Sequence, residues 1–239
     1  MQTIANGRAA LEFDVNFVIN GEIEQVPMIL VADFRTKDTL DEVRIYCHHT
    51  YVPGLQAYRR PLFQSAHLEM ADPDLLTGAV REYYAALHHS PAVDVERILK
   101  CIHPNCKLGA YAPHEGERDN GGSEDLRAFY EGAASYIPRC VAMRYETITD
   151  NGKTCVLEWV HVISKAGQEE HNRIAISGIA AYERGDDGLL CGIRICDYAG
   201  YESTIDWNQL TLTKEEAQQI NYVDTFPSGC GRKKQENLL

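Results

Sequence analysis

The sequence predicts an α+β protein in which helices cover one face of a curved antiparallel sheet. The chain has 239 residues and is 44% hydrophobic, so it can bury one large core or two small ones. Helix-spaced apolar residues come before a run of strand-like segments, which is the order typical of α+β domains. A strand pattern near the N-terminus also returns in the second half, and this indicates an internal repeat.

The repeat is clearest in two short segments. Asn6-Gly7-Arg8-Ala9-Ala10-Leu11-Glu12-Phe13 returns, with one inserted residue, as Asn151-Gly152-Lys153-Thr154-Cys155-Val156-Leu157-Glu158-Trp159. Further along, each copy has an arginine in a short strand, Val43-Arg44-Ile45-Tyr46 in the first and Ile193-Arg194-Ile195-Cys196 in the second. Only the second copy follows a helical region. We therefore expect one complete domain and one fragment without helices.

The first 62 residues are predicted to form a partial β-unit. Asn20-Gly21 is a hairpin signal between two segments rich in Val, Ile, Leu and Phe. Pro53-Gly54 and Pro61 end the unit, and residues 63–73 are expected to be a linker. The predicted strands are Leu11–Val18, Gln25–Phe34 and Leu40–Tyr46.

Residues 74–207 are predicted to form the complete domain. From Asp74 the apolar residues recur at helical spacing, and two more helices are expected over Val93–Ile102 and Glu124–Tyr136. Residues 208–239 are expected to hold a short helix near Thr213–Asn221 and a polar tail. The predicted strands are Val141–Thr149, Thr154–Ser164, Arg173–Tyr182 and Leu189–Tyr198.

Composition argues against several classes of partner. The net charge of -12 disfavours nucleic acid and anionic lipid surfaces, and the sequence has no apolar run long enough to span a membrane. Met1–Ala10 has no apolar signal core, so we expect a cytoplasmic protein whose eight cysteines are reduced. The spacings Cys101–Cys106 and Cys191–Cys196 do not match those of common zinc sites, so no metal site is predicted.

The order of these elements and three local signatures resemble the NTF2-like superfamily, in particular its SnoaL-like and ketosteroid-isomerase-like branch. The first signature is the helical segment Val80-Arg81-Glu82-Tyr83-Tyr84-Ala85-Ala86-Leu87. The second is Ile102-His103-Pro104-Asn105-Cys106 followed by Ser123-Glu124-Asp125-Leu126-Arg127-Ala128-Phe129-Tyr130, and the third is the strand over Gly188–Asp197. The resemblance covers about Asp74 to Tyr201.

This resemblance implies a cone-shaped domain in which helices and a curved sheet enclose an apolar cavity. It also implies a homodimer formed through the sheet. Such cavities serve isomerases, dehydratases, polyketide cyclases and plain binding proteins, so the resemblance by itself does not settle the function.

Tyr83 occupies the position at which ketosteroid isomerases place a tyrosine that donates a hydrogen bond to a developing oxyanion. The alternative is that Tyr83 and Tyr84 only pack the helix against the sheet. The carboxylate base of those isomerases is missing, because the matching segment Lys107-Leu108-Gly109-Ala110-Tyr111 contains no acid, and their later-strand acid falls near the apolar Ile179. Steroid-type isomerisation by that set of residues is therefore not predicted.

Glu158 is the predicted base, because it lies in the middle of an otherwise apolar strand. Burial would raise the pKa of such a carboxylate and allow proton exchange near neutral pH. Glu12 holds the equivalent position in the first copy, so a structural ion pair or a dimer contact is the alternative. Glu158 and His161 are three residues apart on one strand, so at most one of them should face the cavity.

Our leading hypothesis is a cofactor-independent acid/base enzyme, an isomerase, dehydratase or cyclase, acting on a small, largely apolar, oxygenated molecule. Glu158 and Tyr83 would be its catalytic residues. The alternative is a non-catalytic small-molecule-binding or assembly module. The predicted ligand contacts are Tyr84, Tyr111, His114, Tyr130, Arg144, His161 and Asp197.

Overall fold

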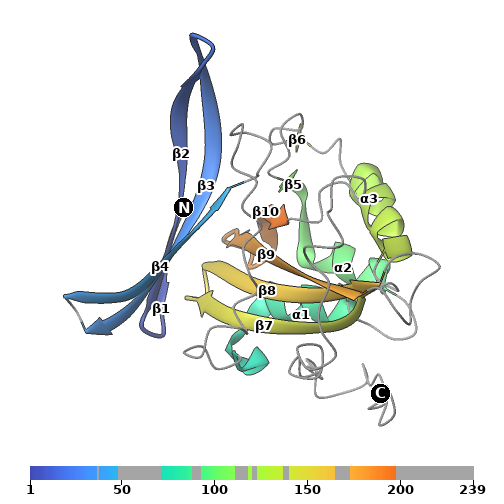
Figure 1. Cartoon of the computed structure of the whole chain (residues 1–239). Coiled ribbons are helices and arrows are strands. Elements are labelled where there is room, and N and C mark those ends of the chain that lie inside the picture. Colours follow the sequence, from blue (N-terminus) through green and yellow to red (C-terminus); the bar gives the residue numbers. More distant parts are fainter. Residues whose placement is uncertain are drawn as a thin grey trace.

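The protein folds as two β-sheets with a layer of helices on the larger one (Figure 1). This computed structural model describes residues 1–36, 38–47, 71–87, 93–110, 118–119, 123–136, 140–164 and 173–197. The described strands form a four-stranded sheet in the order β1-β2-β3-β4 and a six-stranded sheet in the order β6-β5-β10-β9-β8-β7. The α+β fold class predicted from the sequence is confirmed.

The smaller sheet is built from consecutive antiparallel strands near the N-terminus. Asn6-Gly7 and Asn20-Gly21 all have positive φ, between 54° and 86°, as the tightest hairpin turns require. The hairpin predicted at Asn20-Gly21 is confirmed, whereas β1, the shortest strand of this sheet, had not been predicted. The strands are β1 (Gln2–Ala5), β2 (Arg8–Ile19), β3 (Glu22–Thr36) and β4 (Thr39–Cys47).

The larger sheet contains the four strands predicted for the second half, which pair antiparallel in sequence order. β5 pairs parallel with β10 and had not been predicted as a strand, and its first residue, Ile102, had been placed at the end of a helix. Pro104 and Gly109 explain the error, since both residue types are uncommon inside strands. The strands are β5 (Ile102–Ala110), β6 (Arg118–Asp119), β7 (Cys140–Asp150), β8 (Thr154–Ser164), β9 (Arg173–Arg184) and β10 (Leu190–Asp197).

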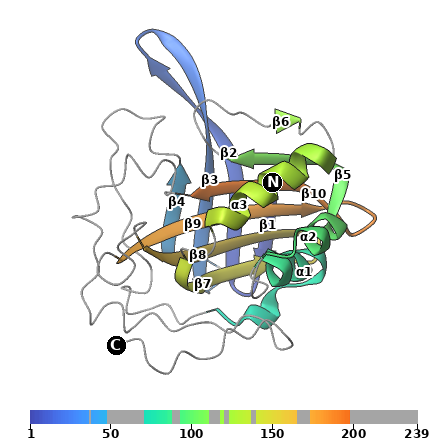
Figure 2. The same cartoon turned by 90° about the vertical axis from the view of Figure 1, so that its right-hand side faces the viewer.

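The helices α1 (Gly78–Leu87), α2 (Val95–Cys101) and α3 (Ser123–Tyr136) lie on one face of the larger sheet (Figure 2). α1 begins later than the predicted Asp74, because Pro73–Leu75 form a separate 3₁₀ turn that Asp72 caps. Asp94 caps α2 by accepting a 3.0 Å hydrogen bond from the backbone N–H of Arg97. Among the described residues, no helix has the length and apolar character needed to cross a membrane.

Side chains of β8 alternate between two buried cores, one on each face of the larger sheet. Leu157 and Trp159 belong to the core beneath the helices, together with Ala180 and Tyr182 of β9. Val156 belongs to a second core, on the opposite face. Successive side chains of a strand point to opposite faces, so one strand can supply both cores.

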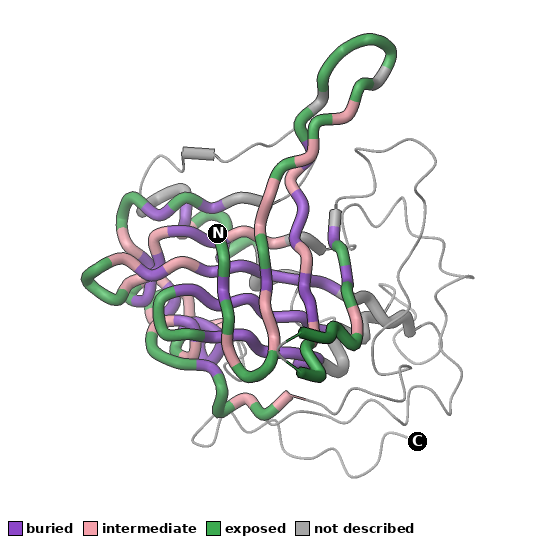
Figure 3. The backbone as a smooth tube through the Cα atoms, turned by 90° about the vertical axis from the view of Figure 1, so that its left-hand side faces the viewer, coloured by how far each residue is buried: buried purple, intermediate pink, exposed green. Residues whose placement is uncertain are grey.

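The smaller sheet covers the face of the larger sheet that the helices leave open (Figure 3). In the views of Figures 2 and 3 the strands of the two sheets cross. The structure thus shows that the N-terminal strands pack within the chain, against the larger sheet. The second core consists of Ala10, Ile29, Val31 and Tyr46 from the smaller sheet and Val156, Ile179 and Ala181 from the larger one.

The predicted domain limits and the predicted homodimer stay predictions. The expected helix at Thr213–Asn221 and most of the expected linker, residues 63–73, lie outside the described residues. A homodimer formed through the larger sheet would need the face that β1–β4 occupy here.

Candidate functional site

A cluster of buried tyrosines lies between the helices and the larger sheet. Tyr83 and Tyr84 come from α1, Tyr130 from α3, Tyr145 from β7 and Tyr182 from β9, and none is more than 4% exposed. Ring centroids lie 5.3 Å apart for Tyr83 and Tyr84, 5.8 Å for Tyr83 and Tyr130, and 5.5 Å for Tyr84 and Tyr145. Most of these contacts are edge-to-face, a favourable arrangement for aromatic rings.

The hydroxyl groups of the cluster form two pairs. The hydroxyls of Tyr84 and Tyr182 lie 2.5 Å apart, and Tyr130 donates a 3.2 Å hydrogen bond to the oxygen of Tyr83. The proton of the Tyr83 hydroxyl has no acceptor within the described part of the chain. Tyr83 is therefore a buried donor that an oxygen atom of a bound molecule could satisfy.

Burial keeps these phenols neutral. Burial raises the pKa of Tyr83 to about 12, and the hydrogen bond from Tyr130 offsets only part of this effect. Burial likewise raises the pKa values of Tyr84, Tyr130 and Tyr182 well above the usual 10. At neutral pH the cluster therefore offers hydroxyl donors and acceptors but no negative charge.

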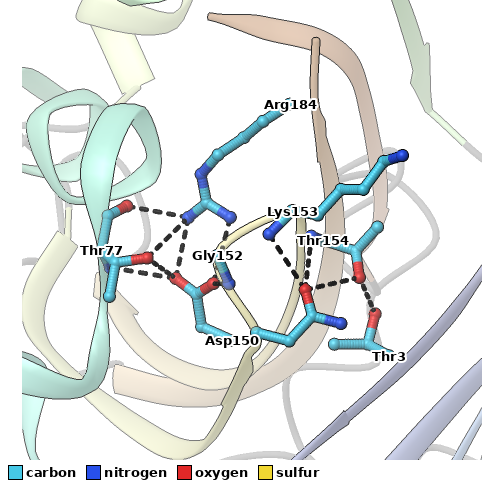
Figure 4. Close-up of polar contacts among 8 residues, drawn as sticks. Thr3, Thr77, Asp150, Gly152, Lys153, Thr154 and Arg184 are labelled. Carbon is cyan, nitrogen blue, oxygen red and sulfur yellow. Dashed lines mark hydrogen bonds and ion pairs between the residues drawn. The ribbon is translucent and has the colours of Figure 1, made fainter. Parts of the chain in front are cut away.

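A buried ion pair fixes the start of α1 and thereby positions Tyr83 and Tyr84. Arg184 on β9 donates two hydrogen bonds, of 3.0 and 2.8 Å, to the carboxylate of Asp150 on β7 (Figure 4). The backbone N–H and the hydroxyl of Thr77, directly before α1, each donate a 2.9 Å hydrogen bond to the same carboxylate. Arg184 also donates to the carbonyl oxygen of Thr77, at 2.8 Å. The pair thus joins α1 to two strands of the sheet.

Glu158 lies on the opposite face of the sheet from this cluster. Its carboxylate accepts two hydrogen bonds of 2.8 Å from Arg44, one of 2.5 Å from the hydroxyl of Tyr46, and one from the hydroxyl of Thr147. Arg44 also forms an ion pair with Asp33. Glu158 and Arg44 each have side chains that are only 1% exposed, so this is a buried ion pair between the two sheets.

The predicted rise in the pKa of Glu158 is wrong. Burial alone would raise this pKa, but the hydrogen bonds and charge of Arg44, with the hydrogen bonds of Thr147 and Tyr46, lower it below the usual 4.5. Burial alone would lower the pKa of Arg44, but the hydrogen bonds and charges of Glu158 and Asp33 raise it. Glu158 is therefore an ionised structural carboxylate, as in the alternative that the sequence left open, and it does not approach Tyr83.

The other predicted ligand contacts fall into two groups. Tyr84 and Tyr130 belong to the buried cluster. Tyr111 and His114 lie outside the described residues, as do the side chains of Arg144, His161 and Asp197, whose backbones belong to β7, β8 and β10.

Sequence reasoning missed the two tyrosines that the sheet contributes to the cluster. Tyr182 lies two residues after Ala180 on β9, on the same face, so strand alternation could have placed it in the interior. Tyr145 directly precedes a register shift between β7 and β8, so alternation is a weaker guide there. Among the described residues, no group of three His, Cys, Asp or Glu side chains could hold a metal ion.

Comparison with known proteins gives matches at the level of structure. No protein-family model matches the chain. No curated protein matches it by sequence.

Several solved structures match about half of the chain. An NTF2-like protein from Burkholderia thailandensis E264 is 14% identical with a TM-score of 0.37, and the match covers 54% of this chain and 92% of that one. The epoxide hydrolase/cyclase-like enzyme SalBIII, which has a role in pyran ring formation in the polyether salinomycin, is 15% identical with a TM-score of 0.38, covering 50% and 87%. A de novo designed protein with a curved β-sheet is 17% identical with a TM-score of 0.37, covering 55% and 93%. Structures that bear the NTF2-like name are thus among the matches, each at low sequence identity.

Proposed function

We propose that the protein is a binding module that holds a small, largely apolar, oxygenated molecule between the helices and the larger sheet. The hydroxyl of Tyr83 supports this proposal, because it accepts a hydrogen bond from Tyr130 while its own proton has no acceptor among the described residues. A buried donor without an acceptor costs about 1–3 kcal/mol. An oxygen atom of a ligand would recover part of that free energy.

The surroundings of Tyr83 define the class of ligand. The core around the cluster consists of apolar side chains and neutral tyrosines, among them Val80, Ile98 and Leu126. Transfer of a charged group into such an interior is costly unless the group finds a partner of opposite charge. The ligand would therefore be neutral, with a hydrocarbon body and a carbonyl, ether or hydroxyl oxygen close to Tyr83.

Binding without catalysis is the first candidate, because the predicted base, Glu158, forms an ion pair on the other face of the sheet. Glu158 is held by Arg44 on the face covered by β1–β4, whereas Tyr83 lies beneath the helices. A proton relay between the two residues would have to cross the sheet.

Acid/base catalysis of an isomerase, dehydratase or cyclase type is the second candidate. The buried hydroxyl of Tyr83 favours it, since a neutral phenol can stabilise a developing oxyanion by donating a hydrogen bond. In this candidate Tyr83 keeps its predicted role and a group other than Glu158 removes the proton.

A pair of probes that differ by one oxygen atom tests the proposal. 2-Acetylnaphthalene carries a carbonyl oxygen, and 2-ethylnaphthalene has nearly the same shape without it. We expect the ketone to bind about fivefold more tightly by calorimetry, which corresponds to one net hydrogen bond of roughly 1 kcal/mol. Tyr83→Phe should abolish this preference because it removes the donor.

Tyr130→Phe is the matched control. It removes a neighbouring hydroxyl but leaves the proton of Tyr83 in place, so the preference for the ketone should remain. An equal preference in wild type and Tyr83→Phe would contradict the binding proposal.

Proton exchange separates the two candidates. In D₂O, a catalytic site would speed the exchange of the methyl protons next to the carbonyl of 2-acetylnaphthalene, which NMR detects. Under the binding proposal the exchange rate of the bound ketone does not rise. A rate that rises in wild type and falls in Tyr83→Phe would instead establish the catalytic candidate.

A further inference from the structure

The ion pairs between the two sheets are reciprocal. Glu158 on β8 binds Arg44 on β4, and Glu12 on β2 binds Arg194 on β10, with 2.7 Å between Nη2 and Oε2. Glu12 and Glu158 hold the same place in the two Leu-Glu-aromatic segments, and the two arginines hold the same place in the two later strands. Each half therefore supplies the glutamate of one pair and the arginine of the other.

The strand registers support the same equivalence. Glu12 lies opposite Ile29 in its sheet, and Glu158 lies opposite Ile179 in the other. Each arginine also pairs with an acid on the neighbouring strand of its own sheet. These pairs are Arg44 with Asp33, and Arg194 with Glu183 at 3.0 Å.

Equivalent positions of the two sheets also supply the apolar part of the interface. Val31 faces Ala10 across β2 and β3, and Ala181 faces Val156 across β8 and β9. The second core thus receives three equivalent positions from each sheet, which are Ala10 and Val156, Ile29 and Ile179, and Val31 and Ala181.

Contacts in which residue i of one unit meets residue j of the other, and j also meets i, define a two-fold interface between like units. We propose that β1–β4 form a copy of the β7–β10 sheet without helices, and that this copy occupies the place of a second subunit within one chain. The face of β7–β10 that carries Glu158 and Arg194 is thus a self-complementary docking surface, filled here by the chain's own N-terminal unit.

The outer face of the N-terminal unit also supports the proposal that this unit is a copy of β7–β10. Leu11, Val43 and Ile45 are 43%, 45% and 53% exposed there. The equivalent residues of the second copy, Leu157, Ile193 and Ile195, pack into the core beneath the helices. The first copy therefore keeps the apolar pattern of a helix-covered sheet on a face where the described helices do not lie (Figure 1).

Displacing the N-terminal unit should expose this self-complementary face. Val31→Asp places a carboxylate in the centre of the interface and changes no residue of β7–β10. The freed face should then bind the same face of a second chain, with Glu158 of each chain next to Arg194 of the other. We expect wild type to sediment as a monomer at micromolar concentration and Val31→Asp to sediment as a dimer.

Ile45→Asp is the matched control, because it adds the same charge on the outer face of the same sheet and should remain a monomer. Circular dichroism verifies that each variant is folded. A folded Val31→Asp variant with the sedimentation of wild type would overturn the proposal.

Charge reversal tests the predicted pairs across the new dimer. Adding Arg194→Glu to Val31→Asp should abolish the dimer, because two acidic side chains would then meet. Adding Glu158→Arg as well should restore it. A dimer that is insensitive to Arg194→Glu would show that a different surface associates, and would refute the self-complementary face.

A double-mutant cycle keeps the proposal testable if Val31→Asp does not fold. Glu12→Gln and Arg194→Gln are made singly and together in the full chain, and the urea midpoint of unfolding is measured. Reciprocal pairing predicts that the double variant loses less free energy of unfolding than the two single variants lose together. Strict additivity would overturn the reciprocity from which the proposal is argued.

Discussion

The carboxylate of Glu158 accepts two hydrogen bonds of 2.8 Å from Arg44, a residue 114 positions earlier in the chain. This contact joins the two sheets inside a buried interface, where Tyr46 and Thr147 complete the coordination of the carboxylate. It accounts for a charged side chain in the middle of an apolar strand without any catalytic role. The chemistry of Glu158 is therefore that of a buried ion pair.

Glu158→Gln should destabilise the protein at neutral pH. The substitution leaves the buried guanidinium of Arg44 without its main counter-charge, and removing one partner of a buried pair costs about 3–5 kcal/mol. Urea unfolding at pH 7 measures the loss. Glu42→Gln, on the exposed side of Arg44, is the control and should change the midpoint far less.

The same residue predicts how stability depends on pH. The pKa of Glu158 is lowered in the folded protein, so its contribution is complete above the usual value of 4.5 and is lost as the pH falls through the lower folded value. We expect the urea midpoint of wild type to fall below pH 4.5, and that of Glu158→Gln to fall less steeply. Parallel pH profiles for the two proteins would contradict this assignment.

Alkaline pH should act through the tyrosine cluster. The pKa of Tyr83 is raised to about 12, so the unfolded chain loses this proton near pH 10 while the folded protein keeps it. Stability should therefore decrease as the pH rises from about 10 towards 12. Tyr83→Phe should reduce the slope of that decrease in urea unfolding, and an unchanged slope would argue against a buried neutral phenol.

Asp150→Asn should loosen α1. The carboxylate binds Arg184 and accepts two hydrogen bonds from Thr77, and its side chain is fully buried. We expect a loss of about 3–5 kcal/mol in the free energy of unfolding. Near-ultraviolet circular dichroism should weaken too, because Tyr83 and Tyr84 lose their fixed surroundings. The exposed ion-pair variant Asp74→Asn is the control and should leave both measurements nearly unchanged.

Gly178→Ala should disturb the sheet beneath the helices. Gly178 lies opposite Trp159, and an added Cβ would come within 2.1 Å of the indole ring. Forcing extra volume into a packed core typically costs about 1–3 kcal/mol, so the melting temperature should fall. Gly132→Ala in α3 meets no atom within 4 Å and should instead raise the melting temperature slightly.

Local patterns in the sequence were sufficient for most elements of this fold. The alternating segments and the Asn-Gly turns predicted β2, β3 and β4. The change from helical to strand periodicity after α3 predicted β7 to β10. Both predictions succeeded because these signals depend on a few neighbouring residues. β5 was missed because Pro104 and Gly109 weaken its strand pattern. Tyr83 could be placed in the interior because its helix has one apolar face.

The direction in which Glu158 points was decided only by the tertiary structure. Strand alternation establishes that Glu158 lies on the face opposite Leu157 and Trp159, but not which face the helices cover. Both faces of β8 are apolar, since β1–β4 bury the second one. The partner that lowers the pKa of Glu158 comes from a strand more than one hundred residues away, and no local pattern encodes such a contact. The sequence thus determined the strands and their turns, whereas the docking of one sheet on the other determined the chemistry of the glutamate between them.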